Sequence, residues 1–220
     1  MKFKIHENIK QENNHVQLGY VVIRNAKVQG TPMALAQKFF QLQSSIAAVY
    51  NIDGLAEVPR LASARNLYNP NEFDITRYDL ESEELVRRVL RKKDAYYVNS
   101  AVVAAQYCSM YLLLPVGLYD LDQIDGNITY RLPREEFYIN INGESMPTKG
   151  QAFLSDDYGV FANGIVDTRR TAVTLSTKNL LAVVYGNGKV TRDELADTLK
   201  LIGETIICYN DGIVEEQGII

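Results

Sequence analysis

Residues 101–126, "AVVAAQYCSMYLLLPVGLYDLDQIDG", combine an uncharged run, a proline and a cluster of aspartates. No charged side chain occurs from Ala95 to Tyr119, a length that could span a bilayer. Polar Asn, Ser and Gln residues interrupt this run, however, and basic residues do not flank it with the usual asymmetry. We therefore predict a strand at residues 96–99 and a buried helix at residues 101–114, and no membrane partner.

Three aspartates, Asp120, Asp122 and Asp125, follow the proline, and closely spaced carboxylates can ligate calcium. In an EF-hand loop the acids occupy the first, third and fifth positions, with glycine at the sixth and glutamate at the twelfth. Here the third acid and Gly126 each come one place late, and Arg131 occupies the twelfth position. The spacing favours a structural turn, and we predict no metal site.

Outward from this stretch, the apolar spacing indicates a mixture of strands and helices. Alternating or short apolar runs predict strands at residues 2–9, 16–24, 127–132, 136–141, 151–156, 172–175 and 179–186. Helical spacing predicts helices at residues 32–49, 57–68 and 80–93, and a last helix after Thr191. Thr31 and Ser82 are the expected caps of two of them, and Thr191 with Glu194 has the pattern of a capping box. This order predicts a mixed α/β layered fold.

Composition restricts the class of protein further. The chain has 220 residues, 46% of them hydrophobic, and a net charge of -4, so it can form a sizeable core but offers no broadly basic surface for DNA. No linker or repeat divides it, and we expect one domain over residues 1–220. The N-terminus lacks the apolar core of a signal peptide, and Cys108 and Cys208 have no metal-site or redox spacing. We therefore expect a cytoplasmic protein whose thiols are reduced and packed.

Motifs of the common catalytic classes are missing from the chain. His6 and His15 are the only histidines, and neither lies in the setting of a nucleophile and its base. The segment "GNGKV" at residues 186–190 lacks the spacing of a phosphate-binding loop, and no dinucleotide-binding motif occurs. We therefore expect no cofactor.

Two basic clusters remain as candidate binding groups. Arg91, Lys92 and Lys93 end a predicted helix, where they either complement the helix dipole or contact an RNA backbone, and the first reading is favoured. In residues 167–171, "DTRRT", two arginines beside Asp167 could hold a carboxylate or phosphate in a fork, or could form an ion pair that fixes the loop. The residue pattern leaves both readings of this second cluster open.

Residues 81–132 together resemble the B3/B4 domain of the phenylalanyl-tRNA synthetase beta subunit and, more closely, the stand-alone B3/4 proteins of bacteria. The landmarks are Ser82, Glu83, Arg87, Arg88, Asn99, Pro115, residues 119–122, Gly126 and Arg131, and later Asp156 and residues 168–171. The resemblance covers roughly residues 55–186. It implies a three-layer sandwich of two sheets and one helical layer. In the synthetase this domain is the editing site, which hydrolyses tRNA mischarged with tyrosine.

The sequence departs from the family at positions that serve editing in the synthetase. Gly117 stands where the editing segment has a histidine, and Arg169 stands approximately where the family has a glutamate. In the central helix, Val103 and Gln106 replace the family's polar pair, an aspartate and an asparagine. Tyrosine specificity and hydrolysis therefore do not carry over directly from the resemblance.

The resemblance and its gaps lead to two functional hypotheses. The first is hydrolysis of mischarged aminoacyl-tRNA in trans, in a pocket formed by residues 101–114, 115–122 and 164–171. Its expected catalytic residues are Arg169 and Arg170, which would stabilise the developing oxyanion. The remaining expected site residues are Ser109, Gly117, Tyr119, Asp120 and Thr171 in the ligand pocket and Arg91, Lys92 and Lys93 as tRNA contacts.

The second hypothesis is a non-catalytic module that binds tRNA, an amino acid or a carboxylate metabolite. The missing editing side chains favour this hypothesis, whereas the intact landmarks favour the first. A protein that binds partners without any small ligand is the remaining alternative, and it applies if side chains fill the pocket.

Overall fold

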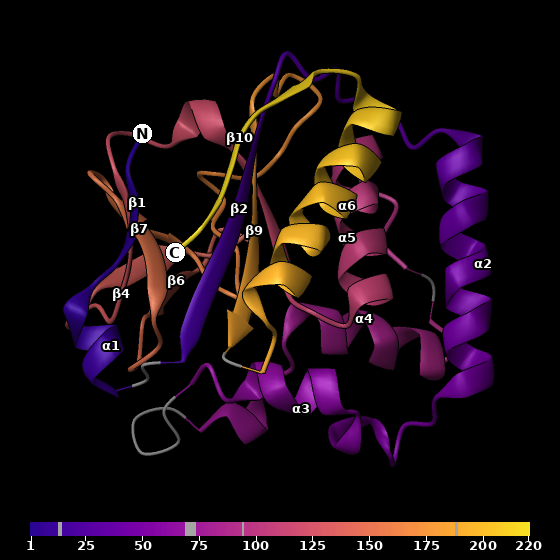
Figure 1. The fold of residues 1–220 in the computed structure, drawn as a ribbon, viewed down its shortest axis with the longest axis horizontal. Helices are drawn as coiled ribbons and strands as arrows, with labels where there is room; N and C mark the ends of the chain where they lie inside the picture. Colours follow the sequence, from indigo (N-terminus) through magenta and orange to yellow (C-terminus); the bar gives the residue numbers. More distant parts are fainter. Residues whose placement is uncertain (13–14, 69–73, 94, 188) are drawn as a thin grey trace.

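The computed structural model describes residues 1–12, 15–68, 74–93, 95–187 and 189–220. Six α-helices lie in these ranges: α1 (Glu7–Glu12), α2 (Met33–Val49), α3 (Pro59–Arg65), α4 (Glu81–Leu90), α5 (Ser100–Leu112) and α6 (Arg192–Asn210). Single turns of 3-10 helix are η1 (Leu55–Glu57), η2 (Ile75–Arg77) and η3 (Leu121–Gln123). The long helices α2, α5 and α6 lie together on one side of the molecule (Figure 1).

The strands form two four-stranded sheets and one small hairpin. The first sheet has the order β10-β2-β9-β3, with strands Ile213–Ile219, Val16–Arg24, Leu180–Asn187 and Val116–Asp120. The second has the order β1-β4-β7-β8, with strands Phe3–Ile5, Ile128–Arg131, Phe153–Asp156 and Gly159–Ala162. The hairpin pairs β5 (Phe137–Ile139) with β6 (Ser145–Pro147). In Figure 1 the first sheet stands between the helices and the second sheet.

The strand β9 explains how the middle sheet is covered on both faces. Leu180, Ala182 and Val184 pack in the core that includes the helices, whereas Leu181 and Val183 pack in the core between the two sheets. Successive side chains of a strand point to opposite faces, so a strand buried on both sides must be apolar at every position. The predicted mixed α/β, sheet-sheet-helix sandwich is therefore confirmed.

The predicted buried helix is confirmed as α5. The side chain of Asn99 accepts hydrogen bonds from the N–H groups of Ala101 (3.1 Å) and Val102 (2.9 Å), which caps the helix start. Leu113 ends the helix in the left-handed conformation, with a φ of 54°. Cys108 is buried inside the helical core, as expected. Within the described ranges, no helix is both long and apolar enough to cross a membrane.

The aspartate cluster forms the turn at η3. The Asp120 carboxylate accepts from the N–H of Asp122 (3.1 Å) and from the hydroxyl of Thr177 (2.7 Å). Asp122 in turn accepts from the side-chain amide of Asn179 at 2.8 Å. These carboxylates therefore hold the turn together, as predicted. Among the described residues, no group of three His, Cys, Asp or Glu side chains could hold a metal ion.

Some predicted strands are wrong. Residues 7–12 form α1 instead of continuing the first strand, and residues 96–99 and 172–175 form no strand. The prediction also missed β3, β6, β8 and β10. The edge strand β10 was not predicted because Glu215 and Glu216 interrupt the alternation of apolar and polar residues. Their carboxylates accept hydrogen bonds from Arg24 and Tyr20 of the neighbouring strand β2.

Two predicted helix caps and one predicted core residue are also wrong. Ser82 lies inside α4 and is buried, and Leu80 at the N-cap makes no side-chain cap. Likewise Pro32, not Thr31, occupies the N-cap of α2. Packing of the helix faces stabilises these ends without a cap. Cys208 is exposed because it lies on the outer face of α6. The capping box of α6 is confirmed.

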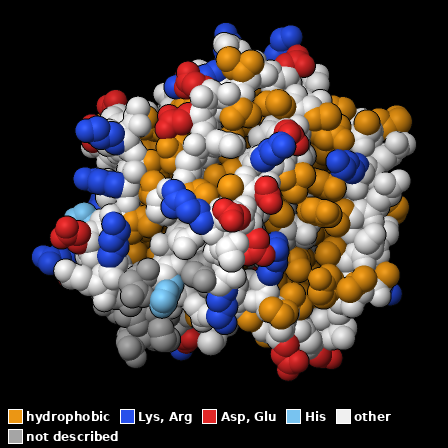
Figure 2. Space-filling view, in the orientation of Figure 1, with side chains coloured by type: hydrophobic (Ala, Val, Ile, Leu, Met, Phe, Trp, Pro, Cys, Tyr) orange, Lys and Arg blue, Asp and Glu red, His pale blue; other side chains and the backbone are white. Residues whose placement is uncertain are grey.

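The surface carries charges of both signs. On the face seen in Figure 2, Lys and Arg side chains are interspersed with Asp and Glu, and apolar side chains gather in the half that holds the helices. Met33, Phe40 and Val49 of α2 are among the exposed apolar residues. This face therefore presents no continuous basic surface, in agreement with the net charge.

Candidate functional site

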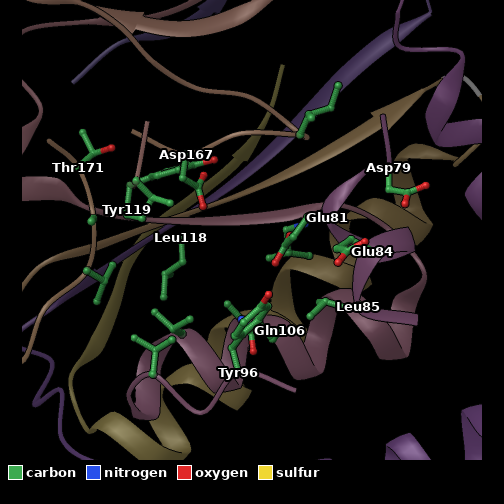
Figure 3. Close-up of a pocket in the computed structure, with 18 of the residues that line it drawn as sticks. Asp79, Glu81, Glu84, Leu85, Tyr96, Gln106, Leu118, Tyr119, Asp167 and Thr171 are labelled. Carbon is green, nitrogen blue, oxygen red and sulfur yellow. The ribbon is translucent and has the colours of Figure 1, made fainter. Parts of the chain in front are cut away.

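A cavity of about 800 Å³ lies between α4, α5, β3 and the loop of residues 165–173. Its apolar lining includes Leu85, Val98, Val102, Ala105, Val116, Leu118, Ile165 and Val173, and its polar lining includes Arg77, Asp79, Glu81, Glu84, Gln106, Tyr119, Asp167 and Thr171. Figure 3 shows Glu81, Gln106 and Asp167 around the same space, from three different segments of the chain. The cavity is large enough for a small organic ligand.

Hydrogen bonds from neighbouring segments hold the carboxyl group of Glu81, the first residue of α4, at the cavity. Its Oε2 accepts hydrogen bonds from the N–H of Val116 (3.1 Å) and from the hydroxyl of Ser109 (3.3 Å). Its own N–H donates to the carbonyl oxygen of Gly164 at 3.0 Å. Burial raises the pKa of Glu81 to about 8, the negative charge of Asp167 adds to this rise, and the two hydrogen bonds oppose it. Glu81 therefore carries a proton at neutral pH.

Asp167 approaches the same cavity from the other side. A β-bridge to Ala162 fixes its backbone, and its side chain lines the cavity, where it keeps access to solvent. Desolvation by the surrounding protein raises the pKa of Asp167 to about 6, and a hydrogen bond from the Tyr119 hydroxyl opposes this rise. Asp167 is therefore mostly ionised at neutral pH, in contrast to Glu81.

A pair of buried tyrosines supports Asp167. The hydroxyl oxygens of Tyr119 and Tyr185 are 2.9 Å apart. Because Tyr119 uses its single proton on Asp167, Tyr185 donates to Tyr119. The absence of a side chain at Gly117 makes this possible, since a Cβ there would overlap the Tyr119 hydroxyl. Gly117, where the resemblance led us to expect a histidine, thus leaves room for the ring of Tyr119.

Gln106 contributes a polar group without a protein partner. The residue is only 9% exposed and lines the cavity from α5. Its Oε1 is buried and accepts no hydrogen bond from the described residues. A buried acceptor of this kind costs free energy until a donor reaches it, so the arrangement suits a ligand that donates.

Arg77 and Asp79 at the rim of the cavity are already paired, whereas Glu84 forms no ion pair among the described residues. The cavity-lining Arg77 forms an ion pair with Asp74 (2.8 Å). Asp79 is bound by Arg87 at 3.1 Å and by Arg65 at 3.6 Å. Glu81 and Asp167 make no ion pair within the described ranges of the chain. They are consequently the acids best placed to act on a ligand.

The predicted pocket residues are distributed around this cavity. Tyr119 and Thr171 line it, Ser109 holds Glu81 from behind, and Gly117 lies under the Tyr119 hydroxyl. Asp120 is not among the lining residues, because its carboxylate is used in the η3 turn. Two of the five predicted pocket residues thus line this cavity, and three do not.

The two arginines predicted to be catalytic lie outside the cavity lining. The Arg170 guanidinium forms two hydrogen bonds with Asp156, at 2.8 and 2.9 Å, and a third with the carbonyl oxygen of Gln123 at 2.6 Å. The backbone N–H of Arg169 donates to the carbonyl oxygen of Ile139, and its side chain is exposed. The sequence left two interpretations of this cluster open, a fork that binds an anion and an ion pair that fixes a loop. Arg170 forms such an ion pair.

The predicted tRNA contacts, Arg91, Lys92 and Lys93, follow α4 and are exposed. They do not line the cavity. Sequence reasoning missed Glu81. It named Gln106 only as a departure from the family pattern, and Asp167 only as a partner of the arginines. Glu81 looked like an ordinary acid in the first turn of a helix, and no local pattern links it to a residue 86 positions away.

The chain forms a mixed α/β sandwich with an acid-lined cavity beside its middle sheet. The B3/4 domain family matches residues 74–201, which is more than half of the chain, and the protein belongs to that family. No curated protein matches the sequence.

Among solved structures, the fold is similar to the crystal structure of an N-terminal fragment of the phenylalanyl-tRNA synthetase beta-subunit from Pyrococcus horikoshii. The TM-score is 0.51 and the sequence identity 14%, and the match covers 99% of this chain and 53% of that fragment. The chain thus spans about half the length of this relative. At so low an identity the likeness shows the fold alone.

Proposed function

We propose that the protein hydrolyses the ester bond of mischarged aminoacyl-tRNA in trans, with Glu81 and Asp167 as its acid and base. The observation that carries the proposal is that two carboxyl groups without ion-pair partners line one cavity and have pKa values of about 8 and about 6. A pair of carboxyl groups whose environments separate their pKa values is the usual arrangement for acid–base catalysis.

The chemistry follows from the two protonation states. The ionised Asp167 removes a proton from a water molecule, and the resulting hydroxide attacks the ester carbonyl carbon. The bond between that carbon and the ribose oxygen then breaks, and the protonated Glu81 gives its proton to the leaving oxygen. The products are a free amino acid and a tRNA with a free terminal hydroxyl, and the two carboxyl groups exchange protons with solvent to reset.

The charge of the cavity supports an ester over a carboxylate metabolite as the ligand. Arg77 is the one described arginine or lysine that lines the cavity, and it is paired with Asp74. A free carboxylate would meet the charge of Asp167 without a cation to balance it. An aminoacyl ester has no carboxylate, because that group is bound to the ribose. The structural likeness to a synthetase beta-subunit supports tRNA as the carrier of the ester, with residues 91–93 as the proposed backbone contacts.

The test is a deacylation panel in which several mischarged tRNAs are incubated with the protein. We expect hydrolysis above the rate in buffer for at least one of them, and a loss of about 100-fold or more in Glu81→Gln and in Asp167→Asn. Arg169→Ala serves as the control because its side chain lies outside the cavity, and it should keep the wild-type rate. Thermal unfolding of each variant separates a lost reaction from a lost fold.

Two results would contradict the proposal. If no tRNA is deacylated faster than in buffer, the protein is a non-catalytic module, as the departures at Gly117 and Arg169 also allow. If hydrolysis occurs but Glu81→Gln and Asp167→Asn keep the rate while Arg169→Ala loses it, the reaction takes place at the arginines and not in the cavity.

A further inference from the structure

The unpaired oxygen of Gln106 indicates what kind of group the cavity binds. More than nine-tenths of this residue is buried, and its Oε1 has no donor among the described residues. The side chain lies on the cavity wall formed by α5, close to Glu81 in the view of Figure 3. An unsatisfied buried acceptor costs free energy, which a ligand donor would recover. The group facing Gln106 in a complex should therefore be a hydrogen-bond donor.

Two further carboxyl groups line the cavity and add hydrogen-bond acceptors to it. Asp167 is ionised at neutral pH, and Glu84 lines the same cavity one turn above the start of α4. The competing cation, Arg77, is held by Asp74, and the Asp79 carboxylate is already occupied by Arg87. A group that carries positive charge and only donates fits this set better than a neutral or anionic one. A primary ammonium group has these properties, with three donors and no acceptor.

The rest of the wall is apolar. Val102 and Ala105 of α5 precede Gln106 by four residues and by one, and Val116 and Leu118 of β3 face them across the space. Burial of an apolar body against these side chains contributes affinity in proportion to its area. The cavity therefore combines carboxyl groups on its walls with a larger apolar lining.

We propose that this cavity binds a primary ammonium group carried on an apolar body, with the amine at Gln106 Oε1 and its positive charge in the field of the acids that line the same cavity. The inference deepens the proposed function, because the α-amino group of an aminoacyl ester is such a group. It implies that the protein accepts aminoacyl groups with a free amine and rejects those whose amine is acylated. The free amino acid binds less well than its amide, since its carboxylate meets the acids of the cavity.

Binding can be measured without any hydrolysis. We suggest calorimetric titration of the full chain at pH 7 with phenylalaninamide, N-acetylphenylalaninamide and phenylalanine, which share one apolar body. We expect the amide to bind at least 10-fold more tightly than either of the other two, because acetylation removes the charge and two donors from the nitrogen. Equal affinities for the amide and its acetylated form, or no binding of the amide, would overturn the inference.

Gln106→Leu tests the orphan oxygen itself. The substitution keeps a helix-favouring residue of similar size and removes a buried acceptor that lacks a donor, so the free protein should melt at the same or a higher temperature. The affinity for phenylalaninamide should nevertheless fall about 10-fold. Gln41→Leu, at an exposed position of α2, is the matched control and should leave the affinity unchanged. Unchanged affinity in Gln106→Leu would also overturn the inference.

This experiment distinguishes the inference from the proposed catalysis. Selective binding of the amide by a protein that deacylates no tRNA would retain the amine site and reject the hydrolase. Conversely, equal rates of hydrolysis for aminoacyl-tRNA and N-acetylaminoacyl-tRNA would retain the hydrolase and overturn the amine site.

Discussion

Asp156 and Asp167 are eleven positions apart, yet they are in opposite chemical situations. The Asp156 side chain is fully buried, and it is satisfied by two hydrogen bonds from Arg170 and by the backbone N–H groups of Asp125 and Tyr158. Asp167 forms no ion pair with any described residue and lines a cavity that is also lined by Glu81. The first carboxylate is fully used by the protein, whereas the second has capacity left for a ligand.

The comparison shows how to separate structural from functional charges in this fold. An acid that a guanidinium already binds in a fork stabilises the loop around it, because removal of either partner leaves a buried charge. An acid that is desolvated without a cation has a raised pKa instead, and such groups gather at sites that bind or react. Arg170 of the sequence motif "DTRRT" binds a carboxylate of the structural kind.

The largest expected effect is a loss of stability when the ion pair between Arg170 and Asp156 is broken. Arg170→Met keeps much of the side-chain volume over Tyr158 and Phe161 but leaves the Asp156 carboxylate buried without its cation. We expect the free energy of unfolding to fall by about 3 kcal/mol, measured by urea denaturation at pH 7. The double variant with Asp156→Asn should recover part of this loss. If Arg170→Met is as stable as the wild type but no longer deacylates tRNA, Arg170 serves the reaction and not the fold.

A smaller effect is expected at the cavity acid, and it depends on pH. An unfolded chain loses the Glu81 proton near pH 4.5, whereas the folded protein keeps it up to about pH 8. The unfolded state is therefore favoured increasingly as the pH rises between these values. The full shift corresponds to about 5 kcal/mol, and solvent contact of the partly exposed Glu81 reduces the expected loss to on the order of 2 kcal/mol, which Glu81→Gln does not show.

Urea denaturation of both proteins at pH 5, 7 and 9 measures this difference. Glu81→Gln should be close to the wild type at pH 5 and more stable at pH 9. Glu204→Gln, at an exposed position of α6, is the control and should follow the wild type at each pH. Parallel curves for Glu81→Gln and the wild type would mean that Glu81 is not desolvated in the folded protein.

The smallest expected effect concerns the tyrosine behind the cavity. Tyr185→Phe removes the donor to the Tyr119 hydroxyl and should cost about 1 kcal/mol of stability. Tyr119 then becomes a weaker donor, so the pKa of Asp167 should rise above about 6. The acid limb of the pH profile for deacylation should shift upward by a fraction of a unit. A lower rate with an unmoved profile would limit Tyr185 to a packing role.

Several parts of the fold could be predicted because their signals are local. The capping box at Thr191 and Glu194 and the charge-free run of α5 are each encoded within a few residues. The continuous apolar run of β9 likewise indicates a strand buried on both faces. The missed edge strand β10 and the misplaced cap at Ser82 show the limit of such signals, because neighbouring elements decided both.

What the sequence by itself determined is the layered α/β class and the landmarks of the B3/4 family, since periodicity and motif order act along the chain. The site depended on tertiary structure. Glu81 and Asp167 are 86 positions apart, and each looks ordinary in its own segment. Their raised pKa values and the unpaired oxygen of Gln106 arise only when folding brings the three side chains to one cavity and surrounds them with protein. The loss of water around a side chain depends on all the residues that pack against it. Most of these residues are distant in the sequence, so the local sequence does not specify them.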